Sequence, residues 1–290
     1  MKQDGKLAYG FLLPASIIIL GTVFYPIVKT FIYSLQRYKL TQPENKKFIG
    51  FQNYIEIFKS QDFQYAFFNT IIIMAVVIFI GFIFSIITAV ILNSKIKISS
   101  LLTAAAVIPW ALPPVVNGIV WKFIFYSDFG FMNKILFKLS LIQEPVKWLD
   151  GRYGTLLIIG LTVAWRVIPF CAVVFLANMQ SIPKEIYEAA EVDGANEIKK
   201  FFNITMPLLM PSAAIVLTNL TMSGINVFDE IVALVGFRNL GQPLLIYNYT
   251  QTFSYMNFGY GSAVTYIIMI ASGFFGYFYI RSLNKGGGAV

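Results

Sequence analysis

The segment from Pro183 to Pro211 combines residue types and spacings that suit docking to another protein. Pro183 fits the first turn of a helix, where its missing amide hydrogen costs nothing. A short helix is expected from Glu185 to Asp193, and Gly194 supplies a left-handed residue that ends it. The small residues Ala189, Ala190, Gly194 and Ala195 would let a second surface approach closely. The carboxylates of Glu188, Glu191 and Asp193 would accept hydrogen bonds from that surface.

A second helix is expected directly after this turn. Four of its residues share one face because they follow the i, i+3, i+4, i+7 spacing: Ile198, Phe201, Phe202 and Thr205. An amphipathic helix seated in a groove of another protein is a recurrent recognition mode, and a stiff one passes motion to the elements behind it. The alternative interpretation is an ordinary loop at the membrane surface.

The residues that most enzymes need are missing. There is no histidine, and the single cysteine, Cys171, lies in an apolar run, so a disulfide framework, a Ser-His-Asp triad and a histidine-bound metal are excluded. No G-x-x-x-x-G-K-[ST] phosphate loop occurs, which excludes that device for holding ATP. We therefore expect a non-catalytic protein with no cofactor of its own.

Apolar runs must position the docking segment. The 290 residues are 57% hydrophobic and 12% charged, whereas soluble domains are about 25% charged. A helix needs about twenty apolar residues to cross the hydrocarbon core of a membrane. Six such runs are expected, and the chain is predicted to be an all-α membrane protein with spans at residues 7–34, 65–92, 100–126, 153–178, 207–232 and 261–282.

The third run contains most of the helix breakers. Pro109, Pro113 and Pro114 lie in "AVIPWALPPVVNG", and a proline frees carbonyl groups that lipid cannot satisfy. This pattern predicts a kinked helix that lines a pathway. A bend accommodated by packing alone is the other interpretation.

Positive charge does not decide the orientation, because lysine and arginine are almost balanced between the two sets of loops. Both termini are expected inside, since "NSKIKIS" and "RSLNK" are basic directly at span ends. The expected organisation is an N-terminal span and outside loop (1–64), a core of five spans (65–282) with the docking loop at 180–206, and a flexible tail (283–290). The net charge of +8 comes from scattered loop residues, so nucleic acid is not an expected partner.

The docking segment resembles a known motif. "EAAEVDGANEIKKFFNITMPLLMP" is similar to the EAA motif of ABC importer permeases in its glutamate, paired alanines, glycine and later prolines. The resemblance implies a type I ABC importer permease fold. It also implies that a coupling helix inserts into a cleft of a separate nucleotide-binding subunit, through Glu188, Ala189, Ala190, Asp193, Gly194 and Ala195.

Further stretches resemble the carbohydrate branch of these permeases, in particular the first permease subunit of maltose and glycerol phosphate importers. They are "FIGFQNYIEIF", "AWRVIPF", "NVFDEIVAL" and "FGYGSA", in that order along nearly the whole chain. One stretch departs from the branch: "VGFRNLGQP" stands where a threonine and a Gly-Gly-Pro turn are usual. Loop 236–243, near the implied substrate entrance, and the identity of the sugar therefore stay open.

A sugar pathway needs aromatic faces and hydrogen-bonding groups inside the spans. The candidates are Trp165, Arg166, Asn219, Thr221, Ser223, Asn226 and Tyr255. Arg166 lies near the middle of the fourth span, where a lipid-facing guanidinium is costly. It either contacts the sugar or forms a structural ion pair, and the other polar residues either line the pathway or bridge helices. Asp229 and Glu230 stand at the outer end of the fifth span, where water could solvate them.

The resemblance implies a complex in the bacterial cytoplasmic (inner) membrane. Its other members would be a second, homologous permease subunit, two ATP-hydrolysing subunits that bind ATP and Mg, and an extracytoplasmic solute-binding protein that delivers the sugar. Two alternatives remain. A secondary transporter should show intramembrane acidic residues and internal repeats, neither of which is evident in the sequence. A membrane scaffold would explain a docking loop without explaining a proline-broken span.

Overall fold

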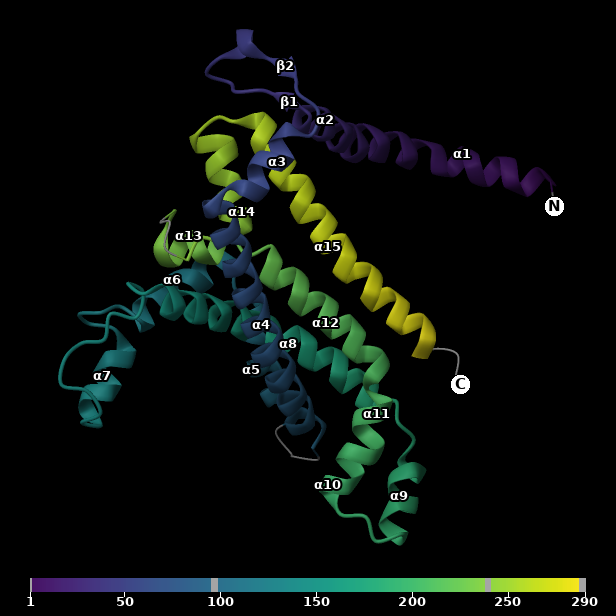
Figure 1. The fold of residues 1–290 in the computed structure, drawn as a ribbon. Coiled ribbons are helices and arrows are strands. Elements are labelled where there is room, and N and C mark those ends of the chain that lie inside the picture. Colours follow the sequence, from purple (N-terminus) through teal and green to yellow (C-terminus); the bar gives the residue numbers. More distant parts are fainter. Residues whose placement is uncertain (1, 95–98, 238–240, 287–290) are drawn as a thin grey trace. The chain divides into compact units, whose positions relative to one another are not determined.

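The computed structural model describes residues 2–94, 99–237 and 241–286 of the chain. Helices dominate these residues, and the one sheet among them is a two-stranded hairpin (Figure 1). The chain divides into two compact units. Unit 1 comprises residues 1–64 and 247–270, and unit 2 comprises residues 65–246 and 271–290.

Unit 1 contains a long apolar helix, a polar hairpin and the region around the start of the last helix. The apolar helix has a π-helical turn in its middle, and the hairpin strands are antiparallel, with Gln36 opposite Phe48 and Arg37 opposite Lys47. The elements are α1 (Lys2–Ile19), η1 (Leu20–Phe24), α2 (Tyr25–Ser34), β1 (Gln36–Arg37), η2 (Pro43–Asn45), β2 (Lys47–Phe48), α3 (Gln52–Lys59), the end of α14 (Leu244–Tyr249), η4 (Thr250–Ser254) and the first part of α15 (Phe258–Gly286).

Unit 2 holds the remaining long helices and several short ones. They are α4 (Gln61–Asn93), of which residues 65–93 belong to this unit, α5 (Ser99–Ala111), α6 (Pro114–Ile124), α7 (Phe131–Lys138), α8 (Arg152–Gln180), α9 (Lys184–Val192), α10 (Glu197–Lys200), η3 (Phe201–Thr205), α11 (Met206–Leu208), α12 (Met210–Ile225), α13 (Asp229–Val235), the first half of α14 and the end of α15.

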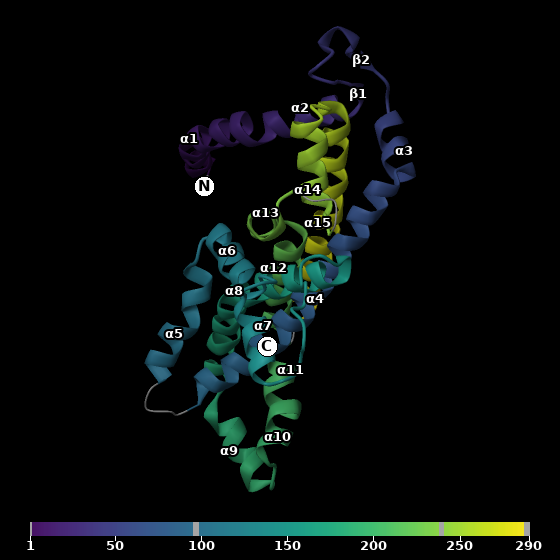
Figure 2. The same ribbon diagram turned by 90° about the vertical axis from the view of Figure 1, so that its left-hand side faces the viewer.

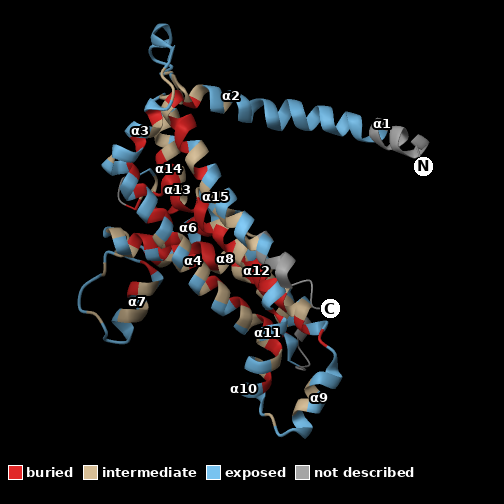
Figure 3. Ribbon diagram, turned by 45° about the vertical axis from the view of Figure 1, so that its right-hand side comes forward, coloured by how far each residue is buried: buried red, intermediate tan, exposed pale blue. Residues whose placement is uncertain are grey.

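Helix α8 contributes more residues to the buried core of unit 2 than any other described helix (Figure 3). It packs against α5 and α12, while the short helix α13 packs closely on α6. Gly160 of α8 permits a close approach to α4, because a Cβ atom there would lie 2.5 Å from Cγ1 of Val76. The buried hydroxyl of Ser85 on α4 donates to the carbonyl oxygen of Ile168 on α8, at 3.2 Å. Apolar packing and this polar contact fix α4 and α8 against each other.

The expected spans are present, two of them broken. Four helices within the described residues are long and apolar enough to cross a membrane, at Phe11–Ser34, Gln61–Asn93, Arg152–Gln180 and Phe258–Tyr279. Two bent pairs bring the number to six if each crosses once: Leu101–Ala111 with Pro114–Ile124, bent by 97°, and Glu197–Leu208 with Met210–Ile225, bent by 71°. The prediction of an all-α protein with about six spans is confirmed in this form.

The kink predicted for the third run is a sharp corner between α5 and α6 (Figure 2). Helix α5 continues through Pro109, and the break falls at Leu112 and Pro113, directly before Pro114 opens α6. The fifth run is also shorter than expected, because α12 ends at Ile225 and α13 is a separate helix. At the C-terminus α15 continues to Gly286; residues 287–290 of the expected tail and residues 238–240 of loop 236–243 lie outside the described residues.

Candidate functional site

The turn between α9 and α10 is built by local hydrogen bonds. Gly194 adopts a φ of +75°, and its amide donates to the carbonyl of Glu191, while the amide of Ala195 donates to the carbonyl of Ala190. These two bonds and the left-handed glycine make a Schellman ending for α9. Asn196 then caps α10, since its side-chain oxygen accepts from the amide of Lys199 at 2.9 Å. The chain therefore reverses within a few residues.

The two arms of this turn lie side by side in Figures 1 and 2. We call residues 184–208 the coupling hairpin; they comprise α9, α10, the π-helical turn η3 and α11. The helix expected at 185–193 is present as Lys184–Val192, and Gly194 ends it as expected. The coupling hairpin leads into α12 through the 71° bend.

Two side-chain contacts hold the arms together. The hydroxyl groups of Tyr187 and Thr205 lie 2.9 Å apart and share a hydrogen bond. The ammonium group of Lys200, whose side chain is 7% exposed, lies 2.7 Å from a carboxylate oxygen of Glu191 and also pairs with Glu197. The hydrogen bonds that Lys200 donates to Glu191 and Glu197 raise its pKa above the ordinary value, so this residue stays cationic. These contacts tie the two arms of the hairpin to each other.

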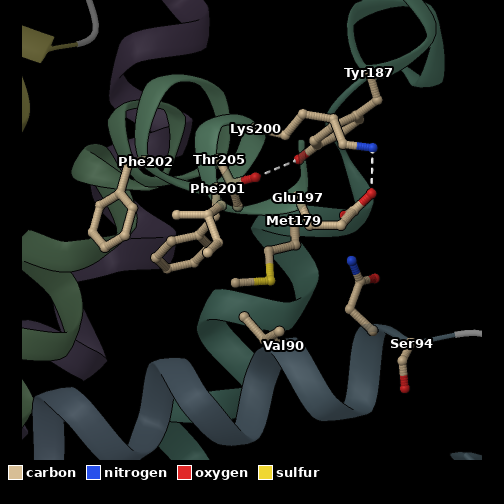
Figure 4. Close-up of a pocket in the computed structure, with 11 residues that line it drawn as sticks. Val90, Ser94, Met179, Tyr187, Glu197, Lys200, Phe201, Phe202 and Thr205 are labelled. Carbon is tan, nitrogen blue, oxygen red and sulfur yellow. Dashed lines mark hydrogen bonds and ion pairs between the residues drawn. The ribbon is translucent and has the colours of Figure 1, made fainter. Parts of the chain in front are cut away.

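A pocket of about 440 Å³ lies behind the coupling hairpin (Figure 4). Its wall includes Val90 and Ser94 at the end of α4 and Met179 near the end of α8, together with the hairpin residues Phe201 and Phe202. Figure 4 draws the Tyr187–Thr205 contact, which ties the two arms, and the Lys200–Glu197 ion pair, which lies within α10. The pocket thus separates part of the hairpin from the ends of α4 and α8.

The six residues predicted to couple lie at the turned end of the hairpin. Glu188, Ala189, Asp193 and Gly194 are exposed, while Ala190 and Ala195 are partly buried. The apolar side chain of Val192, directly before Asp193, is also exposed, at 89% accessible. Small, acidic and apolar groups on a hydrogen-bonded turn form a surface suited to a complementary groove. Their role in coupling stays a prediction.

Arg166 forms an ion pair within unit 2. Its Nε atom lies 2.7 Å from Oε1 of Glu230, with the two side chains 20% and 3% exposed. The bond joins the middle of α8 to the first turn of α13. Of the two interpretations left open by the sequence, this geometry favours the structural ion pair. Glu230 is buried, whereas Asp229 beside it is exposed.

The contacts of α6 reinforce this arrangement. The amide nitrogen of the Asn117 side chain donates to the carbonyl of Thr162 on α8, at 3.0 Å. Gly118 faces α13 so closely that a Cβ atom would lie 2.7 Å from the carbonyl oxygen of Glu230 and from Cβ of Ala233. Helices α6, α8 and α13 are thus fastened together beside the 97° corner.

The other predicted pathway residues of unit 2 have mixed surroundings. Trp165 packs edge-on against Trp121, with ring centroids 6.2 Å apart. The hydroxyl of buried Thr221 shares a hydrogen bond with the hydroxyl of Tyr279 at 2.9 Å. Asn219 lies 3.8 Å from the sulfur of Cys171, and Asn226 donates to the carbonyl of Met222 at the end of α12.

Two candidates remain. Ser223, on α12, is partly buried, and Tyr255 is exposed and belongs to unit 1. The structure thus brings the α8 and α12 candidates into one unit, and several of them bridge helices. Whether these residues meet a substrate stays a prediction.

Comparison with known families decides the classification. The family described as binding-protein-dependent transport system inner membrane component matches residues 81–286. The chain belongs to this family. That match covers the coupling hairpin, both bent pairs and α8, and the several apolar helices fit a multi-pass protein of the inner membrane.

Relatives of this inner membrane component are similar over nearly their whole length. The trehalose/maltose transport system permease protein MalF of Thermococcus litoralis is 32% identical over 272 residues, which is 92% of this chain and 90% of the relative. The arabinooligosaccharides transport system permease protein AraP of Bacillus subtilis is 33% identical over 283 residues, 93% of this chain and 88% of the relative.

A solved structure shares the fold. A bacterial ABC transporter that imports the acidic polysaccharide alginate contains a chain with a TM-score of 0.83 and 21% identity, covering 98% of this chain and 96% of that chain. A chain of the bacterial alginate transporter in complex with an alginate pentasaccharide-bound periplasmic protein has a TM-score of 0.82 and 20% identity. The match covers 96% of this chain and 93% of that chain. The permease fold expected from the sequence is therefore confirmed.

Sequence reasoning missed several residues that shape the site. Tyr187, Lys200 and Thr205 tie the coupling hairpin, yet none of the three was singled out for that role. Thr205 was noted as a member of the amphipathic face, and its hydroxyl was the available signal for a polar contact. Glu230 was noted as a membrane-surface charge, whereas the structure buries it against Arg166.

Proposed function

We propose that this inner membrane component is the permease subunit of an ATP-driven importer of sugars or oligosaccharides. The substrates named for its relatives are trehalose and maltose in one case and arabinooligosaccharides in another, and the alginate importer extends the same fold to a polysaccharide. All are carbohydrates, which supports a sugar as the substrate class. The chain itself would form part of the translocation pathway.

The observation that carries this proposal is the coupling hairpin. A Schellman turn fixes its end, two side-chain contacts tie its arms, and α12 follows it across a 71° bend. A separate ATPase that grips Glu188, Ala189, Ala190, Asp193, Gly194 and Ala195 would push a stiff element, and the push would reach α12 without loss in a flexible linker. This is the kind of lever that alternating access requires.

The remaining parts of the machine would come from partner chains. Two ATP-hydrolysing subunits bind ATP and Mg and supply the energy, a second homologous permease completes the pathway, and an extracytoplasmic solute-binding protein delivers the sugar. The coupling hairpin then lies on the cytoplasmic side together with both termini. In this scheme Trp165, Asn219, Thr221, Ser223, Asn226 and Tyr255 face the pathway in at least one conformation, while Arg166 holds α13 in place.

ATP hydrolysis by the assembled complex tests the proposal. This chain is purified in lipid nanodiscs with its genomic neighbours, the second permease, the ATPase and the binding protein. Sugar-loaded binding protein should stimulate hydrolysis in the wild type. Gly194→Arg should abolish the stimulation or release the ATPase during purification, because the new side chain stands on the docking surface and φ is +75°.

Two controls separate docking from strain. Gly50, a residue of unit 1, also has a positive φ, +59°, and open space around it, so Gly50→Arg places the same side chain on a similarly strained backbone that is not part of the coupling hairpin. It should leave the ATPase bound. Gly194→Asn, which tolerates the left-handed conformation, should retain most of the stimulation. A chain that transports sugar alone, unaffected by the ATPase or by Gly194→Arg, would refute the proposal.

A further inference from the structure

Unit 1 presents a basic hairpin, which we define as residues 36–48. Its two strands and the loop between them carry four exposed cations, Arg37, Lys39, Lys46 and Lys47, and a single carboxylate, Glu44. In Figure 1 the hairpin projects beyond the N-terminal end of α15. The hairpin is therefore a positively charged projection rather than part of an apolar helix surface.

The hairpin is held in one conformation by the rest of unit 1. The amide of Leu40 donates to the carbonyl of Met256 at 2.8 Å, and the amide of Gly259 donates to the carbonyl of Tyr38 at 2.9 Å. The buried side chain of Asn53 donates to the carbonyl oxygens of Ser34 and Gln36. A surface fixed before it meets its partner loses little conformational entropy on binding.

The charge on this surface is not neutralised within the described residues. Arg37 and Lys47 stand directly opposite each other across the two strands, an arrangement of like charges that destabilises a sheet. No carboxylate in the described part of the chain forms an ion pair with Arg37, Lys39, Lys46 or Lys47. Lys46 instead lies over the rings of Tyr33 and Tyr38, 4.8 and 4.2 Å from their centroids. An acidic partner would remove the repulsion.

The same loop is concave and partly apolar. A pocket of about 410 Å³ is lined by Arg37, Gln42, Glu44, Asn45, Lys46 and Lys47. Beside it Phe48 is 72% and Leu40 is 45% exposed. Cations, amide groups and an exposed aromatic ring around a recess make a surface suited to the side chains of a protein loop.

The position of the hairpin along the chain gives its side of the membrane. Three expected spans, α4, the α5–α6 pair and α8, separate it from the coupling hairpin. An odd number of crossings puts the two hairpins on opposite sides. If the coupling hairpin faces the ATPase, the basic hairpin faces the compartment from which the sugar is delivered.

We propose that the basic hairpin is a docking surface for an acidic face of the extracytoplasmic solute-binding protein. This inference rests on the proposed function and specifies which part of the chain meets that partner. Anionic lipid is the competing occupant, but the hairpin projects away from the apolar helices of its unit and carries Glu44 at its tip. A partner that inserts carboxylates into the recess neutralises the repelling charges of Arg37 and Lys47. It also neutralises Lys39 nearby.

The test measures binding of the solute-binding protein to the complete complex in nanodiscs of uncharged lipid. Arg37→Glu, Lys39→Glu and Lys47→Glu are combined in one variant, which reverses three exposed charges and leaves the Tyr-bound Lys46 in place. We expect Kd to rise by about tenfold at low ionic strength, and the difference to shrink as salt is added. A matched control combines Lys134→Glu, Lys138→Glu and Lys147→Glu, three exposed lysines of unit 2, and should change Kd much less.

A fluorophore attached to the hairpin gives a second measurement of docking, and this measurement does not depend on whether the triple charge variant folds. Cys171 is buried, so Thr41→Cys introduces one exposed thiol on the hairpin for a fluorophore. Addition of sugar-loaded binding protein should change its emission, and spin-labelled lipid should not quench it. Quenching by lipid with no response to the binding protein would overturn the inference in favour of a lipid contact.

The two proposals fail in different ways. Suppose that sugar-loaded binding protein stimulates ATP hydrolysis by the wild-type complex, but that the triple variant and its control bind the solute-binding protein with the same Kd. The docking surface is then refuted and the importer assignment stands. If the wild type shows no stimulation by any sugar-loaded binding protein, the importer assignment itself fails.

Discussion

Breaking the Arg166–Glu230 ion pair should reveal how α13 is held in place. Arg166→Met leaves the Glu230 carboxylate, 3% exposed, without its cation. Removal of one partner from a buried pair destabilises by roughly 3–5 kcal/mol, because the remaining charge stays desolvated. Glu230→Gln leaves Arg166, which is 20% exposed and reaches water, and the new amide oxygen still accepts from Nε. Its cost should be nearer 1–2 kcal/mol.

The double variant Arg166→Met with Glu230→Leu distinguishes an ion pair from two independent residues. Replacement of both charges by apolar side chains of similar size is often close to neutral. We therefore expect the double variant to be more stable than Arg166→Met alone, with a coupling free energy of about 2 kcal/mol or more. The single variant Glu230→Leu completes the cycle. The free energy of unfolding is measured for the wild type, Arg166→Met, Glu230→Leu and the double variant by denaturant titration in mixed micelles.

Two results would contradict this reasoning. One is additivity, in which the double variant is as unstable as the sum of the single changes. The other is a cost below about 1 kcal/mol for Arg166→Met, which would mean that the Glu230 carboxylate is solvated. In either case the pair does not fasten α8 to α13, and Arg166 is free to act on the substrate.

Three further predictions concern helix packing and the coupling hairpin. Gly118→Ala should cost about 1–3 kcal/mol of stability, because its Cβ would meet α13 at 2.7 Å, whereas Gly273→Ala, which meets nothing within 4 Å, should be neutral or stabilising in the same titration. Thr221→Val and Tyr279→Phe each break one shared hydrogen bond and should each cost about 0.5–1.5 kcal/mol; the double variant should cost less than their sum, and full additivity would argue against the contact. Lys200→Met should speed amide exchange in residues 184–192 by releasing Glu191, while Lys199→Met on the exposed side should not; equal exchange in both would mean that the ion pair does not stiffen the hairpin.

Much of the fold is predictable because membrane crossing constrains composition directly. Apolar runs of sufficient length located the four unbroken spans and the two bent pairs, and the prolines at 109, 113 and 114 predicted a kink in the third run. Pro183 and Gly194 likewise marked the two ends of α9, since each has a strong backbone preference at its position. These signals are local, so one stretch of sequence contains all the information they need.

The parts that could not be predicted depend on distant contacts. Arg166 and Glu230 are 64 residues apart, and nothing in either neighbourhood identifies the other as its partner. The break between α12 and α13 falls at Asn226, Val227 and Phe228, without proline or glycine, inside a run that is apolar enough to be one helix. Lys200 is buried by the fold of the hairpin, although its sequence context, "EIKKFF", does not distinguish it from exposed Lys199.

The π-helical turn η3, at Phe201–Thr205, sets the rotational phase of the coupling hairpin. A π turn holds about one residue more than an α turn, and one α-helical residue corresponds to about 100° of rotation. Deletion of a single residue within 201–205 that restored an α-helix would rotate α10 by about that angle about the helix axis. The acidic and small residues of the turn would then face another direction while the spans kept their lengths. The number of residues in this short stretch therefore determines the direction in which the turned end of the coupling hairpin faces.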